Sequence, residues 1–548
     1  MSDQIETGSF LQEITTKRFT LLFLLGLSLF IVFARFHTYD EPVEHDITTA
    51  SVIANEMRNG RRYYSEVWEN KPPAVHIVNL MAQELFGYGR GSIYALNVSL
   101  AIITLLGVYV AASSSGMGHA GGLWAAVFWT LVSGDVDLQA NQPNLEAFMN
   151  GPIIWSFALL LCARRSDNGS KRSYIPWSLA IAALLVLASF YKPQCALYGL
   201  FFAMAHIAYP PEQTSRGRKQ ALKEVLIIAG AGAFAWIAFF AYFAITGRFR
   251  ILYITMFVYP SYYSGNLFRN LWRSLRIFEL YPKDLQVISL LVFLTLIGGV
   301  IAWVRRSLRP WVLLIAYAVA TQVEIGLSGR FYNHYYQLWL PLFSVGAGWA
   351  VVLIGGIIKE QLPTWMPHVF GAIALLFILQ AELWVYTMNP EQFSVKSYGG
   401  FYAASENVAH EINNILEPGE TLYVFGDEPA FYFHTKRRPA VGSFFIADLA
   451  GGPLAQELTT RAINDLERQP PDLVIILNSA IGDSTFGPID ARLGPTHPLR
   501  LWVSQHYCPV TLNKIALLTV CAKPGSGIER RPAYQTLITE LNLIKELK

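Results

Sequence analysis

The sequence predicts a polytopic α-helical membrane protein with about eleven transmembrane helices, outer interfacial helices and a small C-terminal α/β domain. Of its 548 residues, 53% are hydrophobic and only 15% are charged, whereas a soluble chain carries about 25% charged residues. Mean hydropathy is +0.34. Apolar runs recur as far as residue 387, and beyond that point short helical and strand patterns alternate. The chain is therefore expected to lie mostly in lipid.

The expected membrane helices follow from run length, because a span needs roughly 17–25 apolar residues. Such runs lie at 19–36, 92–112, 119–133, 151–163, 174–190, 194–209, 225–246, 286–304, 311–327, 337–358 and 367–387. The runs at 119–133 and 151–163 are the shortest of the set. Lys17 and Arg18 precede the first run and no small-residue cleavage site follows it, so we expect a retained signal anchor.

Basic loops predict the orientation of these helices. The loops 164–172, 215–223 and 305–309 are basic, and all fall on one side when eleven spans are counted. The positive-inside rule assigns that side to the cytoplasm. We therefore expect a multi-pass protein of the cytoplasmic (inner) membrane with a cytoplasmic N-terminus. The loops 37–91, 134–150, 247–285 and 328–336, and the chain after about residue 388, would be extracytoplasmic or periplasmic.

The composition also predicts two domains, a transmembrane domain at 1–390 and an outer α/β domain at 391–548. In the second, the apolar runs 421–426 and 472–478 have strand character, with a helical pattern between them. No nucleotide-binding motif marks this domain. The formal net charge of +3 is too small to indicate nucleic acid as a partner. Cys508 and Cys521 end two further segments that we expect to be strands, and whether they pair is left open.

The first outer loop concentrates acidic residues where the chain leaves the first span. Asp40, Glu41, Glu44, His45 and Asp46 lie within seven residues. Apolar residues then recur at helical spacing from residue 47 to residue 57, and a glycine follows at position 60. Asp46 is thus expected at or next to the N-cap of a short helix. It could simply cap that helix, or all five residues could be ordinary solvated charge.

A second short helix is expected at 74–86, after Pro72 and Pro73, because proline is tolerated in a first helical turn. It is apolar but too short to span a bilayer. We expect it to lie along the membrane surface.

These features together resemble the GT-C class of polyprenyl-phosphate-sugar-dependent membrane glycosyltransferases, in the group related to aminoarabinose transferase and protein O-mannosyltransferase. The matching pieces are Asp46, Val52-Ile53-Ala54, Gly60 with Tyr64, and Lys71-Pro72-Pro73, followed by a short helix ending in "LFG". The resemblance covers the membrane region, about 390 residues. One departure is that Asp40-Glu41 matches the Asp-Glu dipeptide of the family more literally than His45-Asp46 does.

The resemblance implies an inverting transfer of a sugar, a hexose or a pentose, from a polyprenyl-phosphate carrier to an acceptor hydroxyl. Asp46 would be the catalytic carboxylate, favoured over Asp40 and Glu44 by its spacing to the "I-A" pair. Lys71 would line the substrate cavity. Asp46 with Glu44 or His45 could hold a divalent metal ion, as in some relatives, although no metal site is predicted firmly from their spacing.

Lys192 follows the span 174–190 in "SFYKPQC". A lysine at a span end can simply reach the interface. The family has a Lys-Pro or Lys-Gly turn facing the lipid phosphate, and an ammonium suits a phosphate. The resemblance therefore assigns Lys192 to donor phosphate binding.

Two further outer loops carry candidate site residues. Asn141 and Glu146 precede the next helix and could cap it or line the cavity, Glu146 as a second catalytic or metal-binding group. In "GRFYNHYYQLWLP", Arg330 and His334 lie four residues apart and would share a helix face. We expect both to contact the donor phosphate and Tyr335 to line the cavity, although the aromatic residues here also fit an interfacial belt.

The expected partners are a polyprenyl-phosphate-linked sugar, membrane lipids, and an acceptor that is a glycan, a lipid or a protein. The alternative is a transporter or flippase of a lipid-linked glycan. Transport predicts ionisable residues near the middle of spans and repeat-related broken helices. In this chain the ionisable residues gather at the outer edge, with Glu324 and Glu382 as exceptions near outer span ends, and no half-to-half repeat is visible. A receptor-like binding protein would leave the acidic loop unexplained.

Overall fold

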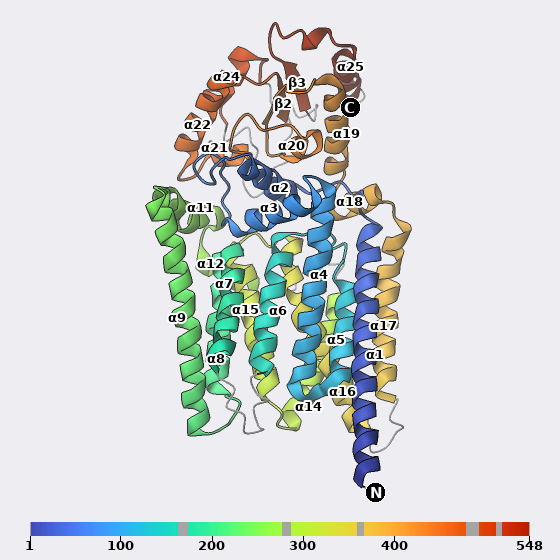
Figure 1. The fold of residues 1–548 in the computed structure, drawn as a ribbon. Coiled ribbons are helices and arrows are strands. Elements are labelled where there is room, and N and C mark those ends of the chain that lie inside the picture. The colour runs from blue at the N-terminus through green and yellow to red at the C-terminus, as the bar shows by residue number, and fades with distance from the viewer. Residues whose placement is uncertain are drawn as a thin grey trace. The chain divides into compact units, whose positions relative to one another are not determined.

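The computed structural model describes residues 2–162, 174–276, 286–358, 366–477, 493–510 and 518–546 (Figure 1). By packing, the chain forms two compact units. The first comprises Met1–Asp40, Tyr94–Ala241 and Asn266–Ser397, and the second comprises Glu41–Ile93, Tyr242–Gly265 and Tyr398–Lys548. The segment 41–93 thus packs with the C-terminal residues. The predicted domain boundary near residue 390 remains a prediction.

The first unit is a bundle of long apolar helices. Its long helices are α1 (Ser2–Phe36), α4 (Arg90–Ala112, from Tyr94 onward), α5 (Gly118–Val132), α6 (Leu145–Cys162), α7 (Tyr174–Tyr191), α8 (Ala196–Ala208), α9 (Ser215–Ile245, as far as Ala241), α14 (Gln286–Val304), α15 (Arg309–Ser328), α16 (Trp339–Ile358) and α17 (Met366–Glu382). Shorter helical pieces are η1 (Ser113–Met117), η3 (Pro193–Cys195), α12 (Leu267–Ser274), η5 (Asn333–Leu338), η6 (Leu383–Thr387) and α18 (Pro390–Tyr398).

All eleven predicted spans coincide with helices. Eight helical segments of the described chain are long and apolar enough to cross a membrane: Lys17–Phe36, Arg90–Ser115, Leu145–Cys162, Tyr174–Tyr191, Ser215–Ile245, Arg309–Ser328, Asn333–Ile357 and His368–Thr387. Apolar helices at Pro193–Ala208 and Ile288–Val304 are shorter, as is α5. The chain is therefore a multi-pass helical membrane protein, while the count of eleven spans remains a prediction.

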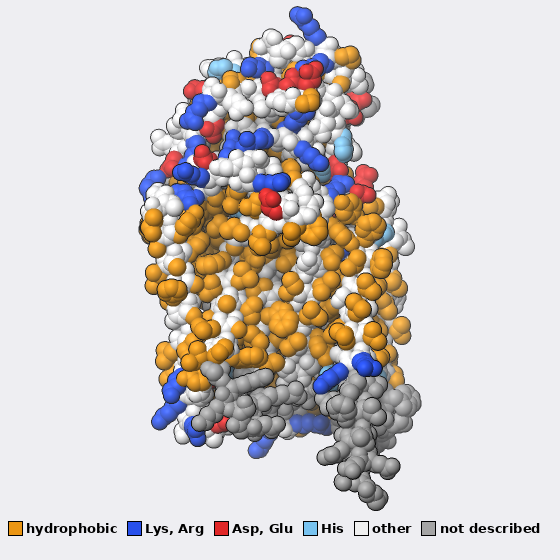
Figure 2. Space-filling view, viewed as in Figure 1, with side chains coloured by type: hydrophobic (Ala, Val, Ile, Leu, Met, Phe, Trp, Pro, Cys, Tyr) orange, Lys and Arg blue, Asp and Glu red, His pale blue; other side chains and the backbone are white. Residues whose placement is uncertain are grey.

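Close packing in this bundle centres on α16, which lies between α5 and α14. At Gly348 a side-chain carbon would lie 2.7 Å from the backbone nitrogen of Ala125, so a small residue lets the two helices approach closely. Figure 2 shows hydrophobic side chains over the flank of the bundle and Lys and Arg side chains at one end of it. Of the three basic loops, 164–172 lies outside the described residues.

The second unit joins the acidic loop to the C-terminal region. Its elements are α2 (His45–Arg58), α3 (Ala74–Phe86), α10 (Phe249–Tyr253), η4 (Ile254–Val258), α11 (Tyr259–Ser264), α19 (Phe401–Ile415), β1 (Leu422–Phe425), α20 (Ala430–Thr435), α21 (Ile446–Ala450), α22 (Ala455–Arg468), β2 (Leu473–Leu477), α24 (Pro498–His506), β3 (Leu518–Ala522), η7 (Ile528–Arg530) and α25 (Pro532–Glu546).

The three strands form one sheet in the order β1-β2-β3. β1 pairs in parallel with β2, with Leu422 opposite Leu473, and β2 pairs antiparallel with β3, with Leu473 opposite Ala522. β1 and β2 are buried throughout, which fits their uninterrupted apolar sequences. The predicted strands at 421–426 and 472–478 are confirmed as β1 and β2.

The segment before Cys508 was expected to be a strand, and that prediction is wrong. Residues 498–506 form helix α24, which begins at Pro498 and buries Leu499, Trp502 and Val503. Their spacing of three and four residues is helical rather than alternating. Cys508 and Cys521 form a disulfide with Cα atoms 6.2 Å apart.

The acidic loop is anchored to the C-terminal region within this unit. The Trp68 backbone nitrogen donates to the Gly442 carbonyl oxygen at 2.8 Å, and the Trp68 indole donates to Thr255 Oγ1 at 3.0 Å. A side-chain carbon on Gly442 would lie 1.7 Å from the Glu66 carbonyl oxygen, so this contact requires glycine. On α3, Ile77, Met81 and Leu85 are exposed on one face, as expected of a helix at a membrane surface.

Candidate functional site

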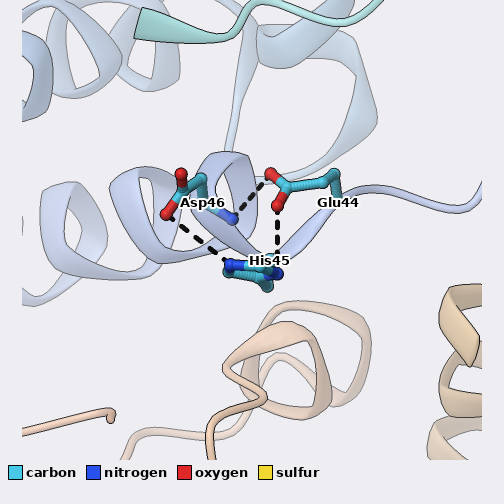
Figure 3. Close-up of side chains that lie close together, drawn as sticks. All are labelled: Glu44, His45 and Asp46. Atoms are coloured by element: carbon cyan, nitrogen blue, oxygen red, sulfur yellow. Dashed lines mark hydrogen bonds and ion pairs between the residues drawn. The ribbon is translucent and has the colours of Figure 1, made fainter. Parts of the chain in front are cut away.

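The acidic loop places three ionisable side chains at the start of α2, as Figure 3 shows. Glu44 is the N-cap, and its Oε2 accepts hydrogen bonds from the backbone nitrogens of Asp46 at 2.7 Å and of Ile47 at 3.4 Å. Asp46 lies two positions further on, and its side chain is 35% exposed. Because Glu44 caps the helix, the alternative that Asp46 serves only as a cap is wrong.

His45 lies between the two carboxylates. Its Nδ1 is 3.0 Å from Glu44 Oε1 and its Nε2 is 3.8 Å from Asp46 Oδ1, and Nδ1 also contacts the hydroxyl of Tyr402. Burial alone would lower the pKa of His45, but Glu44 and Asp46 outweigh it and raise the pKa to about 10. His45 therefore carries a positive charge at the start of the helix.

Lys71 brings a second positive charge to Asp46. Its Nζ lies 3.0 Å from Asp46 Oδ1 and 2.7 Å from Glu69 Oε1, and Glu69 Oε2 lies 3.0 Å from His76 Nε2. Burial alone would lower the pKa of Lys71, but Asp46 and Glu69 outweigh it and raise the pKa above its usual range. Asp46, Glu69, Lys71 and His76 form what we call the Lys71 cluster.

Two tyrosines shape the loop that carries Lys71. The hydroxyls of Tyr63 and Tyr64 donate to the Lys71 carbonyl oxygen at 2.7 and 2.9 Å. Tyr64 is fully buried and adopts a φ of 70°, a left-handed conformation that is uncommon for a bulky residue. Tyr63 also lies 3.1 Å from His76 Nε2. This packing holds the Lys71 backbone so that its ammonium can reach Asp46.

Glu44, His45 and Asp46 also form a group whose donor atoms lie within 4.8 Å of one another, close enough to share a metal ion. Oxygen and nitrogen donors suit a divalent cation. Asp46 is also paired with Lys71, so a divalent ion bound by these three residues would compete with the Lys71 ammonium for that carboxylate.

Lys192 belongs to a different group, in the membrane bundle. It follows α7, and its Nζ lies 2.6 Å from Glu324 Oε1 and 3.7 Å from Glu146 Oε1. The ammonium also lies 4.4 Å from the centre of the Tyr335 ring, within range of a cation–π contact. Glu146, Lys192 and Glu324 form what we call the Lys192 cluster. The predicted site residues Glu146, Lys192 and Tyr335 are thus brought together, but around a lysine whose charge is already matched.

Asn141 lies in the same unit and is hydrogen-bonded to residues at the end of α1. Its Oδ1 accepts a hydrogen bond from Arg35 Nη1 at 2.9 Å, and its Nδ2 donates to Thr38 Oγ1 at 2.6 Å. Arg35 also donates to the carbonyl oxygens of Ser133 and Ala140. These bonds join α1 to the loop before α6. Asp40 is exposed in the turn after α1, outside the helix that carries Asp46.

The prediction that Arg330 and His334 share a helix face is wrong. Helix α15 ends at Ser328, where Gly329 adopts a φ of 68°, and Phe331 has a φ of 57°. Two left-handed residues turn the chain before the short helix η5 begins at Asn333. His334 Nδ1 lies 3.1 Å from Gln139 Oε1, so it contacts the neighbouring loop.

Sequence reasoning missed Glu69, His76 and Tyr402, which contact Lys71, Glu69 and His45, respectively. Glu69 lies two residues before Lys71, and His76 lies in helix α3. Both residues therefore belong to the segment that carries the sequence resemblance. The sequence shows which residues these are and where they lie in the chain. It does not show which side chains they contact, because those contacts depend on the turn at Tyr64. Tyr402 lies in the C-terminal region and contacts His45 only through the fold.

No protein-family model matches the chain, and no curated protein matches it. Solved structures do match. ArnT from Cupriavidus metallidurans bound to undecaprenyl phosphate is 18% identical, with a TM-score of 0.54 over 92% of this chain and 98% of that chain. The same protein in the apo state is 17% identical, with a TM-score of 0.51 over 93% and 98%.

A more distant match is the Archaeoglobus fulgidus oligosaccharyltransferase in the apo form. It is 13% identical, with a TM-score of 0.51 over 89% of this chain and 72% of that chain. Identities this low establish the arrangement of the chain and leave the chemistry to the residues. The chain therefore shares its fold with these membrane transferases, which confirms the resemblance seen in the sequence at the level of fold.

Proposed function

We propose that this protein is an inverting glycosyltransferase that moves a sugar from a polyprenyl-phosphate carrier to an acceptor hydroxyl. The observation that carries the proposal is the pairing of the Asp46 carboxylate with the Lys71 ammonium at 3.0 Å. A carboxylate and a cation side by side are the two groups that such a transfer needs. The shared fold supports the same reaction, because ArnT was crystallised with undecaprenyl phosphate.

In the proposed reaction Asp46 accepts the proton of the acceptor hydroxyl. The acceptor oxygen then forms a bond to the anomeric carbon of the sugar from the face opposite the phosphate. The bond between that carbon and the phosphate oxygen breaks, and the electron pair leaves with the lipid phosphate. One new glycosidic bond replaces one sugar–phosphate bond, so the configuration of the sugar inverts.

Lys71 is proposed to stabilise the negative charge that builds up on the departing phosphate. Its ammonium lies beside the reacting carboxylate in the same compact unit, and Glu69 holds it from the other side at 2.7 Å. Lys192 was expected to bind the donor phosphate, but it belongs to the other compact unit, whereas the Lys71 ammonium contacts Asp46 directly. We therefore assign the phosphate-stabilising role to Lys71. No step is routed through a metal ion.

The proposed location of the site is the outer face of the cytoplasmic membrane. The Cys508–Cys521 disulfide supports this placement of the second unit, because disulfides persist in oxidising compartments outside the cytoplasm. At that face a sugar carried on a membrane lipid is an available donor. The acceptor would be a glycan, a lipid or a protein presented there.

The experiment is to offer the purified protein, in lipid nanodiscs, a panel of radiolabelled polyprenyl-phosphate hexoses and pentoses with envelope lipids and glycans as acceptors. We expect a new labelled glycoside and free polyprenyl phosphate from one donor. Movement of intact donor across vesicles with no covalent product would overturn the proposal in favour of transport. The same panel identifies the sugar.

A further inference from the structure

Helix α12 (Leu267–Ser274) turns its polar side toward the protein and its apolar side outward. Asn270 and Ser274 are buried, and the Ser274 carbonyl oxygen accepts a hydrogen bond from Gln322 Nε2 of α15 at 2.9 Å. At Gly326 of α15 a side-chain carbon would lie 2.9 Å from Ser274 Oγ. Helix α12 is therefore fixed to the last two turns of α15, at one end of the bundle (Figure 1).

The outward side of α12 is apolar and exposed. Phe268 and Trp272 are 80% and 72% exposed, and Leu267 and Leu275 beside them are exposed as well. On the surface of a soluble protein, the apolar side of such a helix would face the core. The inverted arrangement fits a helix whose outer surroundings are lipid, in agreement with a multi-pass membrane protein.

Two exposed arginines lie beside this apolar side. Arg269 follows Phe268 and Arg273 follows Trp272, so the two arginines are four residues apart and share one row along the helix. We call Arg269 and Arg273 the arginine row. Around the helix, the side that contacts the protein is followed by the apolar side and then by the arginine row.

The arginine row has no acidic partner in the part of the chain that the structure describes, where neither guanidinium lies within ion-pair distance of a carboxylate. The Arg273 guanidinium lies 5.2 Å from the centre of the Phe331 ring, within range of a cation–π contact. This contact orients Arg273 and leaves its charge in place. Two such charges next to a lipid-facing surface suit an anion at the level of the lipid headgroups.

We propose that α12 is a binding surface for anionic phospholipids, with the arginine row on the headgroup phosphate and Phe268 and Trp272 in the apolar region next to it. A guanidinium presents N–H donors in a plane that matches the oxygens of a phosphate. Aromatic side chains of an interfacial helix lie at the boundary between headgroups and acyl chains. An anionic lipid is preferred, because the ammonium of a zwitterionic headgroup already neutralises its phosphate.

This surface belongs to the membrane bundle and is not part of the proposed reaction. It stands whether or not the chain transfers a sugar, so the failure of one does not decide the other. The polyprenyl-phosphate carrier is the rival lipid, because it also joins a phosphate to an apolar chain. A second copy of this chain is the rival cover for the apolar side. The experiment therefore has to distinguish a bulk phospholipid from both.

The test is photo-crosslinking of the full-length protein in phosphatidylcholine nanodiscs that contain a small share of a probe lipid. The probe is phosphatidylglycerol or phosphatidylcholine with a diazirine near its headgroup, and mass spectrometry measures the adducts on residues 267–275. In wild type, we expect more adduct from phosphatidylglycerol than from phosphatidylcholine. We also expect added salt to lower this ratio, because salt screens exposed charges. Equal yields from the two probes would overturn the proposal, and so would the absence of adducts from both, which would show that protein covers α12.

Variants separate the arginine row from the apolar side. Arg269→Gln/Arg273→Gln should lower the ratio of phosphatidylglycerol to phosphatidylcholine adduct about fivefold for each arginine replaced. Arg269→Lys/Arg273→Lys should keep part of the preference, because it keeps the charge. Phe268→Ser/Trp272→Ser should lower both yields and leave their ratio unchanged. A wild-type ratio in the glutamine variant would contradict the role of the arginine row.

The matched control is Arg468→Gln/Arg530→Gln, which removes the same charge from two exposed positions of the second unit. We expect its adduct ratio on α12 to equal that of wild type. An equal fall in the control and in Arg269→Gln/Arg273→Gln would show that net charge, and not the arginine row, sets the ratio.

The rival lipid is tested on the wild type by adding polyprenyl phosphate in an amount equal to that of the protein. We expect the phosphatidylglycerol adduct on α12 to persist, because a bulk phospholipid greatly outnumbers the carrier. Loss of the adduct would identify the carrier as the lipid bound there and overturn the assignment to a bulk phospholipid.

Discussion

Lys71 and Lys192 each lie between two carboxylates, but their surroundings differ. Lys71 is 3.0 Å from Asp46 and 2.7 Å from Glu69, and Lys192 is 2.6 Å from Glu324 and 3.7 Å from Glu146. Asp46 keeps 35% of its side chain exposed, whereas both glutamates around Lys192 are buried.

The difference in exposure predicts a difference in role. A carboxylate open to solvent can receive an acceptor hydroxyl and release its proton to water. A carboxylate enclosed in the bundle can reach neutrality only by binding a proton or a cation that stays there. Two carboxylates and a lysine thus suit catalysis in one place and a buried ion-pair cluster in the other. Variants of each cluster test this division.

The largest expected effect is on catalysis. Asp46→Asn removes the proposed base and should lower the transfer rate about 10²–10⁴-fold with only a small change in melting temperature, because Glu44 remains the helix cap and Glu69 still pairs with Lys71. The measurement is the initial rate of transfer, once the donor is known. Asp40→Asn, which alters the exposed neighbour of the same loop, should keep at least half of the wild-type rate. Equal losses in both variants would contradict the assignment of Asp46.

The next effect is on stability and concerns the buried cluster. Lys192→Met leaves two buried glutamates without a cation, which costs about 3–5 kcal/mol when one partner of a buried pair is removed. The two glutamates can limit this cost by holding two protons, which an unfolded chain would release at neutral pH. Stability should therefore fall as pH rises. We expect the melting temperature of the variant, relative to wild type, to be lower at pH 8 than at pH 6.

A compensating substitution sharpens that test. In Lys192→Met/Glu324→Gln only Glu146 remains, and a single protonated carboxyl has no charge to match. We expect the pH dependence to shrink and much of the lost melting temperature to return. A deficit that is the same at both pH values in the single variant would show that lost packing, and not charge, causes the instability.

Replacing Lys71 should lower the rate of transfer slightly less than replacing Asp46 does. Lys71→Met removes the cation proposed to stabilise the departing phosphate and should lower kcat about 10²–10³-fold. Lys71→Arg should recover part of this loss, because it keeps the charge but changes its geometry. Lys396→Met is the matched control, since Lys396 also pairs with an aspartate, Asp137, at 3.2 Å. A loss in kcat for Lys396→Met equal to that for Lys71→Met would argue against a specific role.

The smallest expected effect is the loss of stability when the disulfide of the second unit is removed. Cys508→Ala/Cys521→Ala opens a loop of sequence separation 13 and should cost about 3 kcal/mol. The double variant also tests orientation, because a membrane-impermeant maleimide should label wild-type cells only after reduction and should not label the variant. If the maleimide labels the wild type only after the cells are permeabilised, the second unit lies in the cytoplasm. Asp46 would then be separated from any donor on the outer face.

The sequence predicted the fold well where the signal is local. Each apolar run that was predicted as a span lies on a helix, and helical spacing located α2 and so the position of Asp46 near its start. The apolar runs of β1 and β2 identified the buried strands. It failed at residues 498–506, where a short amphipathic segment is ambiguous between helix and strand.

The site was harder to predict because its contacts are not local. Lys71 was expected only to line a cavity, and its pairing with Asp46 depends on the loop turn at Tyr64, where a bulky residue adopts a φ of 70°. Lys192 was recognised as a charge at a span end, but its pairing with Glu324 depends on which helices are neighbours in the bundle. Residue spacing carries no information on either contact.

The central claim is that the chain carries out a single displacement in which lipid phosphate leaves as the glycosidic bond forms. The most direct test is one product analysis, which measures released polyprenyl phosphate against new glycoside and determines the anomeric configuration of that glycoside by NMR. We expect equal amounts of the two products and an anomeric configuration opposite to that of the donor. Retention of the donor configuration, or lipid phosphate released without glycoside, would contradict it.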